Sequence, residues 1–309
     1  MKDKNVVFMG TPEFAVPVLE MLIEKTNVIM VVTQPDKIVG RKKEIKFSPV
    51  KEVAIKHNIE VFQPSKIRLD YEPLKDLDID LIVTCAFGQI LPKEVLDLPK
   101  YGSINVHASI LPKYRGSAPI EYAIMNGDKK TGVTIMYMDE GMDTGDIIKI
   151  SKLPIEDNDT GGSIHDKLSI LGKDTLECTL KDIFNGNITR IKQGDEFSIA
   201  PKITREDEHI DFNNNGINII NKIRAFNPSP LANIIIDNKE IKVLAAKFVK
   251  KDVNKVSEIV EIDKDKLGIS CKDGIIYLST VKPMGKNIMD IKSFLNGLDK
   301  KSYLRKKVS

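Results

Sequence analysis

The chain has 309 residues and a formal net charge of +3 at pH 7. A chain of this length is longer than a typical single domain. It is long enough for two domains, each of which can bury a hydrophobic core without disulfides or metals. The three cysteines, Cys85, Cys178 and Cys271, lie far apart without a C-x-x-C pair, which argues against a disulfide framework and a zinc site. No apolar run reaches the roughly 18 residues that span a bilayer. We therefore expect a protein of the reducing cytoplasm.

The net charge is divided unequally along the chain. Residues 1–205 carry 28 basic and 30 acidic side chains, whereas residues 206–309 carry 19 and 14, so the two parts have net charges of −2 and +5. A basic second part is typical of proteins with a polyanionic partner such as a nucleic acid. A solvated basic face is the alternative interpretation.

The first part alternates short apolar, β-branched runs with helical segments, which is typical of an α/β domain with a mostly parallel sheet. A helix is predicted from Thr11, as N-cap, and Pro12, as first helical position, to about residue 24. Further helices are predicted at 118–126 and 163–184. Strands are predicted at 5–9, 28–33, 59–62, 81–86, 103–107, 133–138 and 147–150.

The second part follows a polar stretch, residues 186–205, that lacks clear periodicity and is typical of a connection between domains. A helix is predicted at 216–226, ended by Asn227-Pro228-Ser229-Pro230. The short strands that follow are typical of a small β-barrel or a sandwich, between which periodicity does not decide. They are predicted at 232–236, 241–249, 256–262, 267–270 and 274–281.

The first predicted strand ends in the turn Met9-Gly10-Thr11-Pro12-Glu13. A dinucleotide-binding turn requires G-x-G-x-x-G, but positions 12 and 15 hold Pro and Ala. The sequence therefore argues against nicotinamide or flavin binding through this turn.

Polar residues alternate with apolar ones on the predicted strand 103–107. Ile104 and Val106 share one face, whereas Ser103, Asn105 and His107 share the other. A central strand of a covered sheet is normally apolar on both faces, and open α/β sheets bind ligands at the carboxyl ends of their strands. Asn105 and His107 are therefore candidate site residues, with a satisfied buried hydrogen-bond network as the alternative.

An acidic segment, residues 139–146, follows the strand predicted at 133–138. It holds four carboxylates and two glycines, but it lacks the alternating oxygen ligands of an EF-hand loop. One carboxylate, Asp143 being the candidate, can lie beside the histidine of a neighbouring strand. A solvated acidic turn is the alternative.

Together these segments resemble the folate-dependent formyltransferase family. Asn105-Val106-His107 resembles its catalytic Asn-x-His, and Ser109-Ile110-Leu111-Pro112 resembles its folate-contacting turn. Asp143-Thr144-Gly145-Asp146 resembles its acidic segment. The members that act on tRNA share further segments with this chain, among them Gly10-Thr11-Pro12-Glu13-Phe14-Ala15, Gln34-Pro35-Asp36, Arg115-Gly116-Ser117-Ala118-Pro119-Ile120, Thr131-Gly132-Val133-Thr134-Ile135-Met136 and Arg224-Ala225-Phe226-Asn227-Pro228.

The resemblance implies a Rossmann-like formyltransferase domain at 1–188, a linker at 189–205 and an OB-like β-barrel at 206–309 that helps to hold tRNA. It implies transfer of the formyl group of 10-formyltetrahydrofolate to the amino group of methionine on initiator methionyl-tRNA, a step of translation initiation. No metal is required, and we expect a monomer.

The resemblance also implies a role for each candidate. Asn105 and protonated His107 would donate hydrogen bonds to the oxyanion of the tetrahedral intermediate, and Asp143 would stabilise the imidazolium and accept the proton of the amine. The folate pocket is expected at Ser109, Ile110, Leu111, Pro112, Phe87 and Gly88. For Phe87, packing in the core is an equal alternative.

The basic segment 37–46 carries five positive charges and one negative charge. It resembles the loop that enters the tRNA acceptor stem in this family, so Arg41, Lys42 and Lys43 are the expected tRNA contacts. On charge alone, a solvated disordered loop is the better interpretation.

Two other functions share some of these features. Formyl transfer to glycinamide ribonucleotide or an amino sugar would use the same Asn105, His107 and Asp143, although the ribonucleotide enzyme would not need about a hundred residues after the connection. A tRNA-binding protein without catalytic activity is the other alternative. It would not explain why polar residues lie on a central strand.

Overall fold

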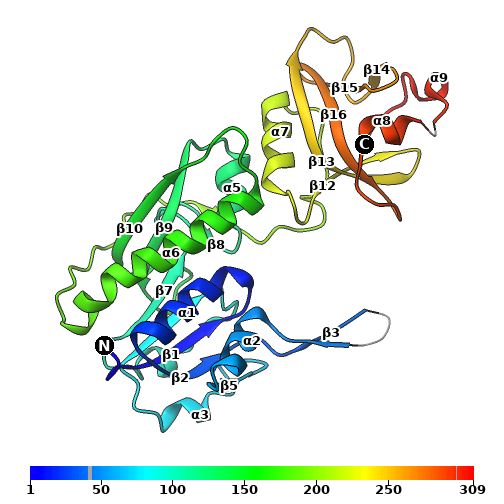
Figure 1. Cartoon of the computed structure of the whole chain (residues 1–309). Helices are drawn as coiled ribbons and strands as arrows, with labels where there is room; N and C mark the ends of the chain where they lie inside the picture. The colour runs from blue at the N-terminus through cyan, green and yellow to red at the C-terminus, as the bar shows by residue number, and fades with distance from the viewer. Residues whose placement is uncertain (41–43, 297) are drawn as a thin grey trace. The chain divides into compact units, whose positions relative to one another are not determined.

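The computed structural model describes residues 1–40, 44–296 and 298–309, which divide into two compact units (Figure 1). The first unit contains Met1–Pro119, Thr131–Leu153 and His165–Ala200. The second contains Ile120–Lys130, Pro154–Ile164 and Pro201–Ser309. The second unit thus includes two stretches from the first 200 residues, and the domain boundaries expected at 188 and 205 stay a prediction.

In the described residues, the first unit is built on a seven-stranded sheet with the order β10-β9-β7-β6-β1-β2-β5. The pairs β1–β2, β1–β6, β2–β5 and β6–β7 are parallel, and β7–β9 is antiparallel. This arrangement confirms the predicted mostly parallel sheet. The strands are β1 (Asn5–Gly10), β2 (Asn27–Val32), β5 (Glu60–Phe62), β6 (Leu81–Cys85), β7 (Ser103–His107), β9 (Lys130–Tyr137) and β10 (Ile147–Pro154).

The predicted cap of the first helix is wrong. Residues Glu13–Ala15 form a 3₁₀ turn (η1), and α1 begins at Val16 without a side-chain cap. The Thr11 hydroxyl instead donates to the Phe87 carbonyl at 3.4 Å, so it joins the ends of two strands. The helices described before residue 200 are α1 (Val16–Lys25), α2 (Pro49–Lys56), α3 (Glu72–Lys75), α4 (Lys93–Leu96), α5 (Pro119–Met125) and α6 (Gly161–Phe184).

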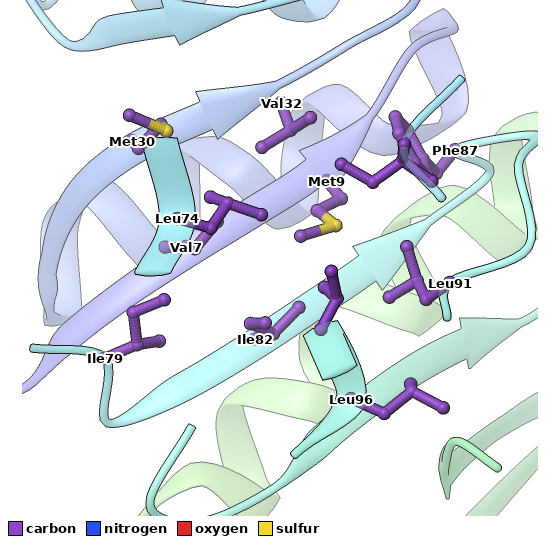
Figure 2. Packing of buried hydrophobic residues seen from close by; sticks show 12 residues of the cluster. Val7, Met9, Met30, Val32, Leu74, Ile79, Ile82, Phe87, Leu91 and Leu96 are labelled. Carbon is purple, nitrogen blue, oxygen red and sulfur yellow. The ribbon is translucent and has the colours of Figure 1, made fainter. Parts of the chain in front are cut away.

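One face of the sheet packs into a cluster of twelve buried hydrophobic residues (Figure 2). Alternate residues of β1 and β2, such as Val7 and Met9, point to this face because side chains alternate along a strand. Leu74 of α3 and Leu96 of α4 cover it. Burying one such side chain fully stabilises the fold by roughly 1.5–3 kcal/mol. The packing of this cluster therefore fixes the positions of the strands at whose ends the candidate site residues lie.

The basic segment differs from the expected loop. β3 (Lys37–Val39) and β4 (Glu44–Lys46) form an antiparallel hairpin in which Lys37 lies opposite Lys46 and Ile38 opposite Ile45. The hairpin projects beyond the seven-stranded sheet (Figure 1). The tRNA contacts expected at Arg41, Lys42 and Lys43 lie outside the described residues.

The second unit carries α7 (Gly216–Ala225), which packs against β13, and antiparallel strands in the order β12-β13-β16-β15-β14. Residues 305–309 hydrogen-bond to Ile259 of β14 and to Ile235 of β12, the two ends of this order. They therefore close the sheet, and the OB-like barrel is confirmed over the sandwich. Its elements are β12 (Ala232–Ile236), β13 (Lys239–Lys250), β14 (Ile259–Ile262), β15 (Leu267–Cys271), β16 (Gly274–Pro283), β17 (Met289–Asp290), α8 (Ile291–Leu295) and α9 (Lys300–Tyr303).

Candidate active site

Asn105 and His107 lie at the carboxyl end of β7, in the first unit. β7 pairs with β6 on one side and with β9 on the other, so it is an inner strand of the sheet. The His107 side chain is 6% exposed and the Asp143 side chain 16%. Polar groups at such depth need hydrogen-bond partners, and these partners define the site.

The Asn105 amide is oriented from both sides. The Thr84 hydroxyl on β6 donates to its Oδ1 at 2.8 Å, and its Nδ2 donates to Asp143 Oδ1 at 3.4 Å. Because an ionised carboxylate only accepts hydrogen bonds, the Asn105 NH₂ group must face Asp143. The amide is therefore held with its donors toward the acid.

The His107 ring lies between a carbonyl and the same acid. Its Nε2 is 3.0 Å from the Tyr114 carbonyl oxygen, and its Nδ1 is 3.6 Å from Asp143 Oδ2. Since a carbonyl oxygen only accepts, Nε2 carries a hydrogen in the neutral ring. In that tautomer Nδ1 has no hydrogen and faces the Asp143 carboxylate.

Asp143 is held by the backbone as well as by its neighbours. Its φ angle is 54°, in the left-handed region that is unfavourable for most residues other than glycine. The Gly116 N–H donates to Asp143 Oδ2 at 2.9 Å. Asp143 thus contacts Asn105 and His107, the two candidate residues of β7.

Another acid of the 139–146 segment shapes the turn. Asp139 Oδ1 accepts hydrogen bonds from the Gly141 N–H at 3.0 Å and from the Thr144 hydroxyl at 2.6 Å. At Gly145 an added Cβ would lie 2.0 Å from the Tyr137 carbonyl oxygen, so only glycine fits. The acidic segment is therefore an ordered turn, and its internal hydrogen bonds fix the position of Asp143.

The turn expected to contact folate follows β7 directly. Ser109 is fully buried, and its hydroxyl donates to the Lys113 carbonyl at 2.6 Å. The Leu111 N–H donates to Thr134 Oγ1 at 3.1 Å, and the Leu111 side chain packs in a small cluster with Met136 and Ile147. Ile110 and Pro112 are half-buried, so they are the side chains of the turn with exposed surface.

Phe87 lies in the hydrophobic core, as the alternative interpretation had it. Its side chain is 4% exposed and belongs to the cluster that contains Met9 and Leu91 (Figure 2). Its carbonyl accepts a hydrogen bond from Gln34 Nε2 at 3.0 Å. Gly88 has φ of 81°, so it turns the chain sharply after β6. Any folate contact at this turn is thus made by the backbone or by Gly88 rather than by a buried ring.

Three residues that support Asn105 or Asp143 were absent from the sequence-based site. Thr84 orients Asn105, Gly116 binds the carboxylate, and Gln193 Nε2 donates to the carbonyl oxygens of Asp143 and Gly145 at 2.8 Å each. Arg115-Gly116 stands in a segment that the resemblance singled out. Gln193 lies in the polar stretch without periodicity, where no local pattern marks it.

No group of three or more His, Cys, Asp and Glu side chains in the described residues could hold a metal ion. Nor does the described part of the chain contain a helix that is long and apolar enough to cross a membrane. Cys85, beside Thr84 on β6, is fully buried, and this burial raises the pKa of its thiol. A thiol that stays neutral is a poor nucleophile, so Cys85 is a core residue.

Both parts of the chain match known families. Residues 4–179 match the formyl transferase family, and residues 202–299 match the formyl transferase C-terminal domain. The chain is 43% identical over 312 residues to the methionyl-tRNA formyltransferase of Pediococcus pentosaceus, covering 99% of this chain and 98% of that relative. It is 45% identical over 296 residues to the methionyl-tRNA formyltransferase of Macrococcus caseolyticus, covering 95% of each.

A solved structure shares the fold. The N-formyltransferase from Helicobacter canadensis, in complex with folinic acid and dTDP-3-aminofucose, superposes with a TM-score of 0.67. The match covers 89% of this chain and 99% of that one, at 23% identity. At that identity the likeness concerns the fold alone.

Proposed function

The chain belongs to the formyl transferase family, and we propose that Asn105, His107 and Asp143 form the acid-base site with which it formylates methionine on initiator methionyl-tRNA. The formyl donor is 10-formyltetrahydrofolate. The observation that carries the proposal is the position of Asp143, whose carboxylate oxygens lie 3.4 Å from Asn105 Nδ2 and 3.6 Å from His107 Nδ1. The acceptor is supported by relatives of 43% and 45% identity that formylate methionyl-tRNA.

Asn105 stabilises the oxyanion. When the methionine amino group attacks the formyl carbon, the carbonyl oxygen becomes negatively charged. The Asn105 NH₂ group has two hydrogens and directs only one to Asp143 at 3.4 Å, so the other can donate to this oxygen. Removing one such donor from an oxyanion site typically costs roughly 3–4 kcal/mol of barrier.

His107 supplies a second donor when it is protonated. Its Nε2–H is directed to the Tyr114 carbonyl, which fixes the ring plane. The proton on Nδ1 is stabilised by Asp143 at 3.6 Å, a separation longer than an ordinary hydrogen bond. Without moving the ring, the Nδ1–H can therefore donate to a substrate oxygen that lies beside the carboxylate, whose charge balances the imidazolium.

Asp143 accepts the proton that the amine loses. Its Oδ2 accepts from Gly116 and its Oδ1 only weakly from Asn105, so lone pairs remain for a substrate N–H or a bridging water. As the new C–N bond forms, the amine releases its proton to the carboxylate. When the oxyanion re-forms the carbonyl and the bond between the formyl carbon and folate N10 breaks, Asp143 returns this proton to N10, so the carboxylate is ionised again.

The substrate contacts follow from the same placement. We assign the folate contacts to Ser109, Ile110, Leu111 and Pro112 and to the turn of Phe87 and Gly88, through backbone atoms wherever the side chain is buried. The tRNA contacts are assigned to Arg41, Lys42 and Lys43, which stand between β3 and β4 in the sequence, and to the OB-like barrel.

The base of the hairpin supports this assignment. The Lys51 ammonium lies 2.6 Å from Asp36 Oδ2 and 4.1 Å from the centre of the Phe47 ring. Asp36 immediately precedes β3 and Phe47 immediately follows β4. The half-buried Lys51 side chain thus contacts both ends of the hairpin and joins them to α2.

An amino sugar is the competing acceptor, because a sugar N-formyltransferase shares the fold. The direct test is to incubate the protein with 10-formyltetrahydrofolate and each of three acceptors: methionyl-tRNA, glycinamide ribonucleotide and an amino-sugar nucleotide. We expect formylation of methionyl-tRNA alone. Formylation of the sugar nucleotide but not of the tRNA would refute the proposed acceptor.

We further propose that the protein works as a monomer in the cytoplasm. Cys85, Cys178 and Cys271 are all free thiols, which suits a reducing compartment. Sedimentation of the purified protein over a concentration series tests the monomer, and a mass that doubles with concentration would contradict it.

A further inference from the structure

Gln193 contacts the acid of the site although it stands 50 residues away in the sequence. Its amide nitrogen donates one hydrogen to the Asp143 carbonyl oxygen and the other to the Gly145 carbonyl oxygen, each at 2.8 Å. Its Oε1 accepts a hydrogen bond from Arg115 Nε at 2.9 Å. Every hydrogen of the amide is therefore used, and we propose that Gln193 is a positioning residue that acts on the reaction through Asp143.

The two carbonyls that Gln193 binds belong to Asp143 and Gly145, so these hydrogen bonds restrain the backbone at Asp143. Asp143 adopts φ of 54°, a conformation that costs free energy in a residue with a side chain. Binding the carbonyls on both sides of Thr144 holds this conformation. The direction of the Asp143 carboxylate toward β7 then depends on the Gln193 amide.

Through its Oε1, Gln193 binds Arg115, the neighbour of the glycine that donates to the Asp143 carboxylate. Arg115 is 8% exposed, and its guanidinium lies 4.6 Å from the centre of the Phe197 ring. The next residue, Gly116, donates its N–H to the Asp143 carboxylate. Gln193 thus joins the backbone that carries the acid to the strand that supplies its hydrogen-bond donor.

Gln193 is itself held on both sides. Ile191 exchanges backbone hydrogen bonds with Ile147, at the start of β10. β11 (Ile199–Ala200) pairs with β8 (Arg115–Gly116). Because the chain is anchored at both ends of this short stretch, little conformational freedom is lost when the side chain binds. A segment expected to be a linker is in this way part of the site.

The inference rests on the proposed roles of Asn105, His107 and Asp143, and the variants separate it from them. Gln193→Glu keeps an oxygen for Arg115 but places a second oxygen against two carbonyls. Gln193→Met keeps the approximate volume and removes every hydrogen bond. Lys192→Gln is the matched control, because it shifts the net charge by the same amount as Gln193→Glu at an exposed neighbouring position.

We expect both Gln193 variants to lower kcat about 10- to 100-fold, because displacing a reacting group by about 1 Å typically costs that much. KM for folate and for tRNA should change less than about threefold, and the melting temperature should stay near that of Lys192→Gln. In single-turnover assays on an Asp143→Ala background, Gln193→Met should cause no further loss. A residue with a purely structural role would not show this dependence on Asp143.

Each other outcome has a definite meaning. Normal kcat in both Gln193 variants, an additive loss on the Asp143→Ala background, or failure of both variants to fold would overturn the positioning role. Normal turnover in Asp143→Ala itself would instead refute the proposed acid-base site.

Discussion

Gly116 donates its backbone N–H to Asp143 Oδ2 at 2.9 Å, on the oxygen that lies 3.6 Å from His107 Nδ1. Gly116 has φ of 118°, and a Cβ added there would lie 2.6 Å from the Ala200 carbonyl oxygen. A side chain is thus excluded from the position that supports the acid, because the backbone of β11 occupies its space.

Gly116→Ala should therefore displace β8 or β11 and move the amide away from the carboxylate. We expect turnover to fall at least tenfold and the melting temperature to fall, because backbone strain of this kind costs on the order of 1–3 kcal/mol. Gly194→Ala is the control, since open space surrounds Gly194. Unchanged turnover in Gly116→Ala would show that this hydrogen bond is dispensable.

Asn105→Ala, His107→Ala and Asp143→Ala should each lower turnover by at least about 100-fold, because in the proposed mechanism these groups act mainly in the transition state. The affinity for tRNA should hardly change. Steady-state kinetics and filter binding measure the two quantities. Effects in double variants should be far from additive, since the three groups form one unit. Glu140→Gln, an exposed acid of the same segment, should keep full turnover.

The β3–β4 hairpin should make tRNA binding dependent on salt. Lys42→Ala and Lys43→Ala are each expected to reduce the slope of the logarithm of affinity against the logarithm of salt by roughly 0.7 to 0.9 per lost phosphate contact. Arg41→Lys should lose tRNA formylation although it keeps the charge, because lysine cannot form the two parallel bonds of a guanidinium. Folate binding should stay normal. Full activity of Arg41→Ala, with an unchanged slope, would remove the hairpin from the tRNA site.

Cutting the chain after residue 205 should leave a fragment that binds folate but no longer formylates tRNA. We expect it to melt at a lower temperature than the whole chain. The reason is that Arg224 donates to the Asp159 carbonyl at 2.8 Å, and Gly162 donates to the Asn227 carbonyl at 2.9 Å. A cut after residue 188 should have a larger effect, because it also removes Gln193 and β11. Calorimetry and folate titration compare the two fragments, and equal behaviour would contradict the role of residues 191–200.

Tyr277 on β16 should make stability depend on pH in alkali. Burial, followed by the hydrogen bond to Glu261 at 2.7 Å, raises the pKa of Tyr277 from its ordinary value of 10.0 to about 12. Between these values the unfolded chain loses the phenol proton and the folded chain keeps it. Since the unfolded state then binds fewer protons, the free energy of unfolding falls as pH rises.

Tyr277→Phe should therefore show a shallower loss of stability between pH 10 and 12 than the unaltered chain. Chemical denaturation at several pH values measures the difference, and the tyrosinate absorbance of the two proteins locates the titration. Parallel stability curves would mean that the folded state does not hold this proton.

The alternation of side chains along a strand allowed part of the candidate site to be predicted from the sequence. Side chains alternate along any strand, so Asn105 and His107 had to share a face, and the apolar runs of the first part had to form a covered parallel sheet. The cap expected at Thr11 failed because this threonine bonds to Phe87, which is 76 residues away. Phe87 itself had two equal interpretations, and only the packing of β1 and β6 placed its ring in the core.

By itself, the sequence determined which strand carries the candidate site residues and which residue types are on its polar face. The sequence also made Asp143 the acid expected beside His107, but the contacts of Asp143 with the Gly116 N–H and the Gln193 amide were decided by the tertiary structure alone. Their contacts span 27 to 50 residues of chain and depend on the left-handed backbone of Asp143. Local periodicity arises from backbone geometry over a few residues, whereas such contacts arise from loops that distant backbone atoms hold in place.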